Sequence, residues 1–292
     1  MSVAPQHWSD LARGLNSPLP AGRVRAAREL GKLGPAAVAA MPALLAAVED
    51  ADQSVREAAV QAVAHLGPTA VGSLVQLLSH TDKYVRRNAT WGLGKLGPAA
   101  RSGMAALCAA LHDADPRTAS GAAQALGSLA SAAEHAIPAL TEAMRGTNVV
   151  QCRLAAKALS QIGAASVPTL LTHLKHHDPF VRGEAAVALG WIGPAAAEAV
   201  PALLEMVRTG SALPARVADA LGGSGLGTPL APPPELDPGS SEETSRLAAV
   251  TALGRIGPAA AAALPELLAV AAERGEATRA AAEIALRQIR GC

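Results

Sequence analysis

An internal repeat of about 33 residues is the feature that most constrains this chain. Segments of thirteen residues with one shared pattern begin at Val55, Val85, Val181 and Ser245, for example VRRNATWGLGKLG from Val85. More diverged copies begin at Gly22, Thr118, Gln151 and Thr278. The last positions of successive segments are separated by 33, 30, 33, 33, 30, 64 and 33 residues. A period of this length is typical of repeat arrays, in which each repeat is one supersecondary unit.

Each thirteen-residue segment has the pattern of an amphipathic helix. Apolar or small residues recur at positions 1, 5, 8, 9 and 12, as in Val85, Ala89, Gly92, Leu93 and Leu96. Offsets of three and four place such residues on one side of a helix. Glycine occupies position 13 in most segments, where it can adopt the left-handed conformation that ends a helix. We therefore predict a first helix with one buried face in every repeat.

A second apolar segment follows each first helix. Examples are AMPALLAAVE, SVPTLLTHL and AVPALLEMV, and most carry a proline in the first turn, where a helix tolerates it. Repeats of 30 and 33 residues differ by about one helical turn, which a helix can lose without rotating its buried face. A lone hairpin cannot bury its apolar face, so neighbouring hairpins have to stack. The sequence predicts an all-α fold, an α-α superhelix of about seven to eight two-helix repeats.

We expect one solenoid over residues 1–292. A capping helix is expected at 5–17, repeats one to six at 22–208, and the last repeat with a C-terminal capping helix at 245–292. Residues 209–244 contain an eroded repeat and a loop rich in glycine and proline. A loop of this length either has a function, such as contacting a partner, or is a tolerated insertion. The sequence leaves both interpretations open.

The lead-in to the first helices resembles that of a known repeat family. The segments ADQSVREAA, TDKYVRRNA and HDPFVRGEA share an Asp-x-x-Val-Arg-x-x-Ala pattern. They resemble the short HEAT-like repeats named after phycobilisome lyase subunits, and the resemblance covers about residues 20–290. It implies the helical-repeat fold and, as an alternative function, a bilin lyase-like subunit that handles a chromophore. No active residue of such a lyase can be carried over.

The composition limits the classes of function. The formal net charge is +1 and aromatic residues make up 2% of the chain, so we predict no nucleic-acid partner. The three cysteines have no CxxC spacing, and the longest apolar run is too short to span a bilayer. We expect a soluble protein of the cytoplasm or another reducing compartment, without signal peptide, membrane insertion or cofactor.

Two recurring patterns could be mistaken for catalytic or metal sites. An acidic lead-in residue accompanies the arginine at position 2 in several repeats, for example Asp52 with Arg56. A group that recurs in successive layers is better explained as a structural ion-pair ladder, so we expect no enzymatic activity. His173, His176 and His177 have spacings that could hold a metal. Histidines recur near equivalent helix ends, however, and we predict no metal site.

Candidate binding residues lie opposite the buried stripe or at the turns between repeats. Trp91 and Trp191 occupy positions 7 and 11, which are mainly polar in the other repeats, and tryptophan is a frequent interface anchor. Each ring could instead fill a gap between alanine-rich neighbours. Aromatic residues before a Val-Arg pair could likewise pack against the adjacent layer. The candidate protein-binding residues are Trp91, Trp191, Lys95, Glu184, Tyr84 and Phe180.

We therefore expect a non-enzymatic scaffold or adaptor. Solenoids present extended surfaces, usually lined by the second helices, that can hold a segment of another protein. The expected partner is a protein or peptide segment of unknown identity. The sequence leaves open which face binds, and whether the chain is a monomer or a subunit of a larger complex.

Overall fold

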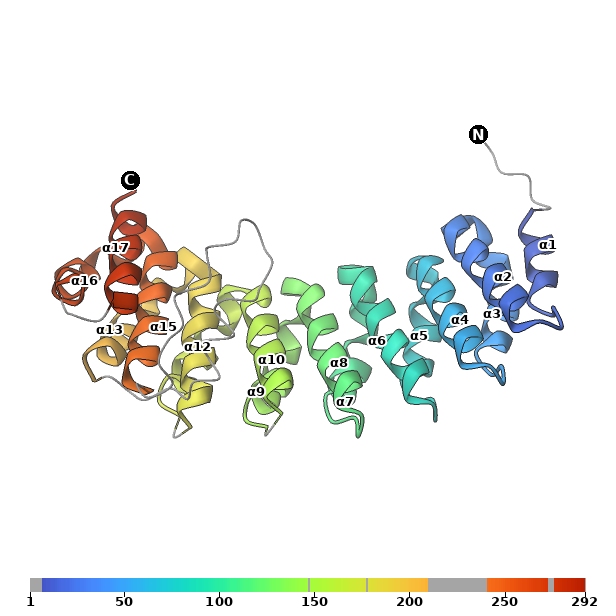
Figure 1. Ribbon diagram of the computed structural model, residues 1–292, viewed down its shortest axis with the longest axis horizontal. Coiled ribbons are helices and arrows are strands. Elements are labelled where there is room, and N and C mark those ends of the chain that lie inside the picture. The colour runs from blue at the N-terminus through green and yellow to red at the C-terminus, as the bar shows by residue number, and fades with distance from the viewer. Residues whose placement is uncertain (1–6, 147, 177, 210–240, 273–275, 292) are drawn as a thin grey trace. The chain divides into compact units, whose positions relative to one another are not determined.

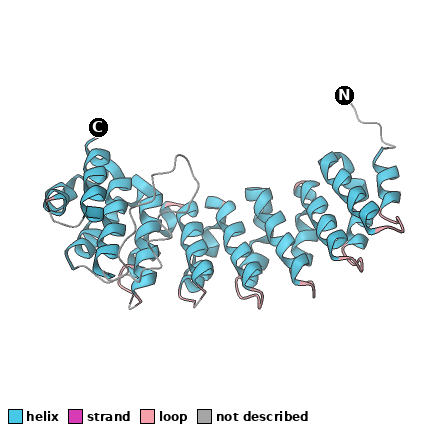
Figure 2. Ribbon diagram, viewed as in Figure 1, coloured by secondary structure: helices cyan, strands magenta, loops and turns pink. Residues whose placement is uncertain are grey.

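The computed structural model describes residues 7–146, 148–176, 178–209, 241–272 and 276–291. Every regular element in these residues is a helix, which confirms the predicted all-α solenoid fold (Figure 2). The chain divides into two compact units, Met1–Ala139 and Leu140–Cys292. That all repeats form a single array stays a prediction. Most of the predicted eroded repeat and loop at 209–244 lies outside the described residues.

Unit 1, Met1–Ala139, is a stack of helical hairpins that follows the short helix α1 (His7–Gly14). Its first helices contact one another in chain order and stand side by side (Figure 1). They are α2 (Pro20–Leu33), α4 (Gln53–His65), α6 (Lys83–Leu96) and α8 (Pro116–Ser128). The second helices are α3 (Met41–Ala47), α5 (Val71–Leu77) and α7 (Met104–Ala110).

Unit 2, Leu140–Cys292, repeats this arrangement, and its boundary with unit 1 falls within α9 (Ile137–Met144). Its first helices are α10 (Val149–Ile162), α12 (Pro179–Ile192), α15 (Ser241–Ile256) and α17 (Glu276–Arg290). Its further second helices are α11 (Val167–His173), α13 (Val200–Thr209) and α16 (Leu264–Ala271). Helix α12 contacts both α10 and α15, and α15 contacts α17.

A 3₁₀ segment joins each first helix to its second helix. Most of these segments have seven residues: η1 (Gly34–Ala40), η3 (Gly97–Gly103), η4 (Ala130–Ala136), η6 (Gly193–Ala199) and η8 (Gly257–Ala263). In the two repeats of 30 residues the segments have only three, η2 (Pro68–Ala70) and η5 (Ala164–Ser166). The shorter repeats therefore lose residues from the 3₁₀ connection and not, as the sequence suggested, from an α-helix. The α-helices keep their length, so their buried faces are unchanged.

Glycine at the end of the first helix adopts the positive φ that the pattern predicts. Gly34 has φ of 57°, Gly97 of 54° and Gly193 of 72°. Ala130 occupies the equivalent position with φ of 50°. Left-handed backbone costs a residue with a Cβ atom roughly 1–2 kcal/mol, so this turn is less stable than its sisters.

Successive first helices approach closely because glycine at position 10 of one faces alanine at position 8 of the next. A Cβ atom added to Gly94 would lie 3.2 Å from Cα of Ala125, and one added to Gly190 would lie 2.9 Å from Cα of Ala252. Glycine inside a helix is unfavourable by about 1 kcal/mol relative to alanine, and here it permits backbone contact. The same approach joins Gly31 to Ala62 and Gly254 to Ala285.

The arginines at position 2 form the predicted ion-pair ladder between adjacent layers, but Asp52 caps α4 and is not the partner of Arg56. Arg56 binds Asp82 of the next layer and donates from Nη1 to the Asp50 carbonyl oxygen at 2.7 Å. Asp82 also caps α6 by accepting from the Tyr84 amide at 2.8 Å. These contacts orient each turn against its neighbour. The pairs in unit 1 are Arg23–Asp50, Arg56–Asp82 and Arg86–Asp113, with Nε–Oδ2 distances of 2.6, 2.7 and 2.7 Å.

Three helical stretches are long and apolar enough to cross a membrane by length and composition alone, which the longest apolar run did not indicate. Each stretch joins a first helix, a 3₁₀ segment and a second helix, and contains a glycine with positive φ. Each is therefore two α-helices separated by a bend. The stretches are Pro20–Ala47, Phe180–Arg208 and Leu247–Ala271. The expected cytoplasmic localisation stays a prediction.

Candidate protein-binding surface

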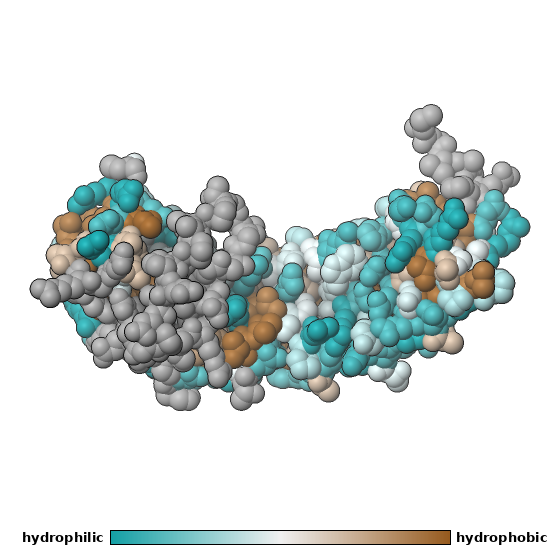
Figure 3. Space-filling view, viewed as in Figure 1, coloured by the Kyte–Doolittle hydropathy of each residue, from teal (hydrophilic) through white to brown (hydrophobic). Residues whose placement is uncertain are grey.

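Positions 4, 7 and 11 of the first helices form one face of unit 1, which we call the first-helix face. All four residues at position 7 are exposed, as are three of the four at position 11. Hydrophilic residues cover most of the visible surface of unit 1 in the space-filling view (Figure 3). The residues of the first-helix face are Arg25, Ala58, Asn88 and Gly121 at position 4, Arg28, Gln61, Trp91 and Gln124 at position 7, and Lys32, His65, Lys95 and Ser128 at position 11.

Trp91 is the centre of a cluster on this face, and 45% of its surface is exposed. The Lys95 ammonium lies 5.1 Å from the centre of the Trp91 ring, within the range of a cation–π contact. The His65 ring, from the preceding layer, lies 5.7 Å from the Trp91 ring. His65 Nδ1 donates to the Gln61 carbonyl oxygen at 2.7 Å, and its Nε2 accepts from Lys95 Nζ at 2.9 Å.

A pocket of about 380 Å³ lies beside Trp91, between α6 and α8. Trp91 and Lys95 line it from α6, and Gln124 and Ser128 line it from α8. Thr90 and the small residues Gly94, Gly121 and Ala125 complete the lining, and a Cβ atom added to Gly94 or Gly121 would collide with the facing helix. The pocket thus combines an exposed aromatic ring with amide, hydroxyl and ammonium groups.

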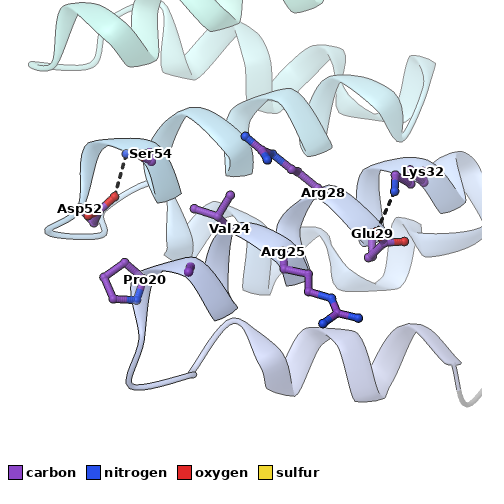
Figure 4. Close-up of a pocket in the computed structure, with 9 residues that line it drawn as sticks. Pro20, Val24, Arg25, Arg28, Glu29, Lys32, Asp52 and Ser54 are labelled. Atoms are coloured by element: carbon purple, nitrogen blue, oxygen red, sulfur yellow. Dashed lines mark hydrogen bonds and ion pairs between the residues drawn. The ribbon is translucent and has the colours of Figure 1, made fainter.

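A second pocket, of about 520 Å³, lies along α2 and beside the start of α4 (Figure 4). Arg25 and Arg28 extend from α2 in different directions, and both are exposed. Neither guanidinium forms an ion pair with the residues that the structure describes. Lys32, by contrast, binds Glu29 at 2.7 Å. Within the part of the chain that the structure describes, the first-helix face therefore begins with two arginines that have no ion-pair partner.

The predicted binding residues of α12 lie in a different environment from those of α6. Trp191 is half-buried, Phe180 is 8% exposed and Glu184 is fully buried. Phe180 and Glu184 are buried among their neighbours, and their predicted role in binding a partner stays a prediction. Helix α12 is packed between α10 and α15, and Arg153 of α10 lies 3.7 Å from the Glu184 carboxylate. Burial raises the pKa of Glu184 to about 7, despite the attraction of Arg153.

Tyr84 is half-buried in the first turn of α6 and takes part in the contact between layers. The Arg87 guanidinium lies 5.0 Å from the centre of the Tyr84 ring, and the Lys83 ammonium lies 5.4 Å from it. Arg87 also binds Asp115 of the next layer, with Nε 2.7 Å from Oδ2. Tyr84 therefore covers an ion pair, in agreement with the packing interpretation.

Neither the histidines nor Cys152 form a reactive site in the described residues. No group of three or more His, Cys, Asp or Glu side chains among them could hold a metal, and His177 lies outside them. His173 is buried, and its ring stacks on His176 with the centres 6.1 Å apart. Cys152 donates to the Met144 carbonyl oxygen at 2.9 Å, and burial raises the pKa of its thiol. A thiol with a raised pKa is a weak nucleophile.

The structure adds His65, Arg28 and Gln124 to the surface around Trp91 and Lys95. These residues occupy positions 7 and 11 of their repeats, as Trp91 and Lys95 do. Their repeat position is therefore the feature by which the sequence could have identified them. Their contribution depends on which repeats are neighbours and on how closely the first helices approach, and neither can be read from one repeat alone.

Several solved helical-repeat structures are similar to this chain. One is an engineered protein with 22% identity and a TM-score of 0.47, covering 97% of this chain and 88% of that chain. Another is the complex of CpcE and CpcF of phycocyanin lyase from Nostoc sp. PCC7120, with 20% identity, a TM-score of 0.46 and coverage of 99% and 96%. Computationally designed armadillo repeat proteins for modular peptide recognition have 19% identity, a TM-score of 0.43 and coverage of 63% and 99%.

The family comparison gives a more specific result. No curated protein sequence matches this chain. The family described as HEAT repeats matches residues 9–74, 71–156 and 147–222. These ranges cover more than half of the 292 residues and include the helical hairpins from α2 to α13. The chain therefore belongs to the HEAT-repeat family.

Proposed function

We propose that this protein is a non-enzymatic scaffold that binds a segment of another protein along the first-helix face of unit 1. The observation that carries the proposal is the exposed Trp91 ring beside the pocket between α6 and α8. At protein interfaces a few residues contribute most of the binding energy, and tryptophan is frequent among them. HEAT-family membership supports the proposal, because repeat arrays offer extended surfaces for such segments.

The groups on this face are suited to binding. Trp91 offers apolar area, Gln61 and Gln124 offer amide donors and acceptors, and Lys95 offers a positive charge. A partner that covers Trp91 removes most of the remaining ring surface from water. Truncation of such an anchor typically weakens binding by about 2 kcal/mol or more, which is roughly 30-fold in Kd.

The alternative function is a bilin lyase-like subunit that handles a chromophore. Its support is the resemblance of the lead-in pattern to the repeats of that family. Co-expression of the protein with bilin distinguishes the two functions. An absorbance band that stays with the purified protein favours the alternative, and its absence favours the scaffold.

The scaffold proposal is tested by affinity capture with mass spectrometry, using wild type, Trp91→Ala and Trp191→Ala. We expect Trp91→Ala to lose specific partners while its helix content and Tm stay close to wild type, because the ring is exposed. Trp191→Ala examines the second candidate ring, and we expect it to lower Tm, because this ring is half-buried. Retention of every partner by Trp91→Ala contradicts the proposal.

A further inference from the structure

We infer that the first-helix face of unit 1 selects an extended, acidic segment of the partner, whose carboxylates meet the cations of α2 and α6 while an apolar side chain enters the pocket beside Trp91. This inference rests on the proposed function and adds the chemistry of the partner. Three features of the face carry it: its charge, the spacing of its layers and the shape of the pocket.

The first-helix face has a one-sided charge, although the net charge of the whole chain is only +1. Positions 4, 7 and 11 of unit 1 carry the cations Arg25, Arg28, Lys32 and Lys95, and no acidic residue. Lys32 is bound by Glu29, but Arg25 and Arg28 have no ion-pair partner among the described residues. Among the described residues Lys95 forms no ion pair, and its ammonium lies against the Trp91 ring and 2.9 Å from His65 Nε2. A partner with carboxylates would supply the missing negative charge.

The spacing of the layers fits an extended chain. Packed helices lie about 8–10 Å apart, so α2 and α6, two layers apart, are separated by roughly 16–20 Å. An extended peptide rises about 3.3 Å per residue, so roughly five or six residues bridge these two layers. A segment that crosses the first helices would thus place one carboxylate near Arg28 and another, five or six residues along, near Lys95.

The pocket between α6 and α8 favours an apolar side chain next to the second carboxylate. Its volume of about 380 Å³ is larger than one amino-acid side chain, and Trp91 gives it an apolar wall. The exposed amides of Gln61 and Gln124 lie in the same column and can bind both the N–H and C=O groups of a peptide backbone. A single exposed aromatic ring on this face does not provide the successive stacking platforms that single-stranded nucleic acid needs.

The inference is tested by selecting peptides from a random twelve-residue phage-display library on the immobilised full chain. We expect enriched peptides to carry two acidic residues five or six positions apart, with an apolar residue next to one of them. The strongest peptide is then synthesised with a fluorescent label, and its Kd is measured by anisotropy. Raising the salt concentration should weaken this peptide's binding, because exposed charges are screened over about 10 Å at 0.1 M salt.

Single charge reversals locate the binding face. Arg28→Glu and Lys95→Glu should each weaken binding of the labelled peptide about tenfold, since attraction becomes repulsion. Arg101→Glu is the matched control, because this exposed arginine in η3 lies outside the first-helix face and its reversal changes the net charge equally. We expect that control to change Kd by less than about twofold. Circular dichroism confirms that the three variants fold.

Each other outcome overturns a specific part of the argument. Peptides that need Trp91 but show no excess of acidic residues overturn the acidic partner and leave the proposed function intact. A set of peptides that bind Trp91→Ala as well as wild type overturns both, as does a library without enrichment. Displacement of the labelled peptide by a single-stranded oligonucleotide at physiological salt overturns the inference in favour of nucleic acid.

Discussion

Replacement of Gly190 by alanine tests whether close backbone contact sets the packing of the first helices. Gly190 lies inside α12, where helix propensity alone predicts that alanine stabilises the protein by about 1 kcal/mol. The added Cβ atom would lie 2.9 Å from Cα of Ala252 and 3.2 Å from its Cβ atom. Propensity and packing therefore predict effects of opposite sign.

The magnitude follows from these two distances. Carbon atoms in contact prefer a separation of about 3.5–4.0 Å, so the new Cβ atom is too close by roughly 0.6–1 Å. The nearest atom of Ala252 belongs to the backbone, and relief requires α12 and α15 to move apart. Overpacking of this kind costs about 1–3 kcal/mol. After the gain of about 1 kcal/mol in helix propensity we expect a net loss of up to about 2 kcal/mol in the free energy of unfolding.

The assay is urea denaturation followed by circular dichroism, with Gly72→Ala as the matched control. Gly72 lies in α5, is exposed, and has no atom within 4 Å of an added Cβ. We expect Gly72→Ala to raise the free energy of unfolding by up to about 1 kcal/mol and so to raise the urea midpoint. We expect Gly190→Ala to lower the urea midpoint. A rise in the midpoint for both variants would refute the packing argument.

Three further predictions concern the turns between helices. Ala130→Gly should raise the free energy of unfolding by about 0.5–1 kcal/mol and therefore raise the thermal midpoint, since glycine adopts a positive φ without the strain that alanine has. An unchanged or lower thermal midpoint contradicts this. Asp82→Asn should lower the free energy of unfolding by about 1–2 kcal/mol, seen as a lower urea midpoint. Asparagine keeps the helix cap but loses the charge that binds Arg56. Wild-type stability of this variant would show that the ion pair contributes little. Arginine hydrogen bonds lower the pKa values of Asp50 and Asp113, so their stabilisation is complete above about pH 4 and decreases as the pH falls below it. Asp50→Asn combined with Asp113→Asn should flatten an acid titration of stability below that pH, and an unchanged slope contradicts the assignment.

The recurring features of the fold could be predicted from the sequence because each leaves the same mark in several repeats. The buried stripe, the glycine that ends the first helix and the Asp–Arg ladder all belong to this class. The 3₁₀ connections could not be predicted, since alanine-rich segments such as GPAAVAA fit an α-helix equally well. Because the sequence does not distinguish a 3₁₀ segment from an α-helix here, it also could not show that the shorter repeats lose their residues from the 3₁₀ connection.

The candidate site was predictable only in part. The column position of Trp91 and Lys95 indicated an exposed face, and the structure places both there. The same reasoning placed Glu184 on an exposed face, yet it is fully buried. Column position specifies where a side chain leaves its own helix, but neighbouring elements decide whether water reaches it. A single repeat carries no information on those neighbours.

The packing of the first helices and the binding surface have a common origin. Gly94 and Ala125 let α6 approach α8 closely, so that Trp91 and Gln124 line the same pocket. A larger residue at position 94 would both separate the helices and fill the pocket, and would therefore reduce stability and binding together. Trp91 lies on the outside of the same contact, where truncation leaves the helix packing intact. The two kinds of residue can thus be separated experimentally, because only the second changes binding without changing the free energy of unfolding.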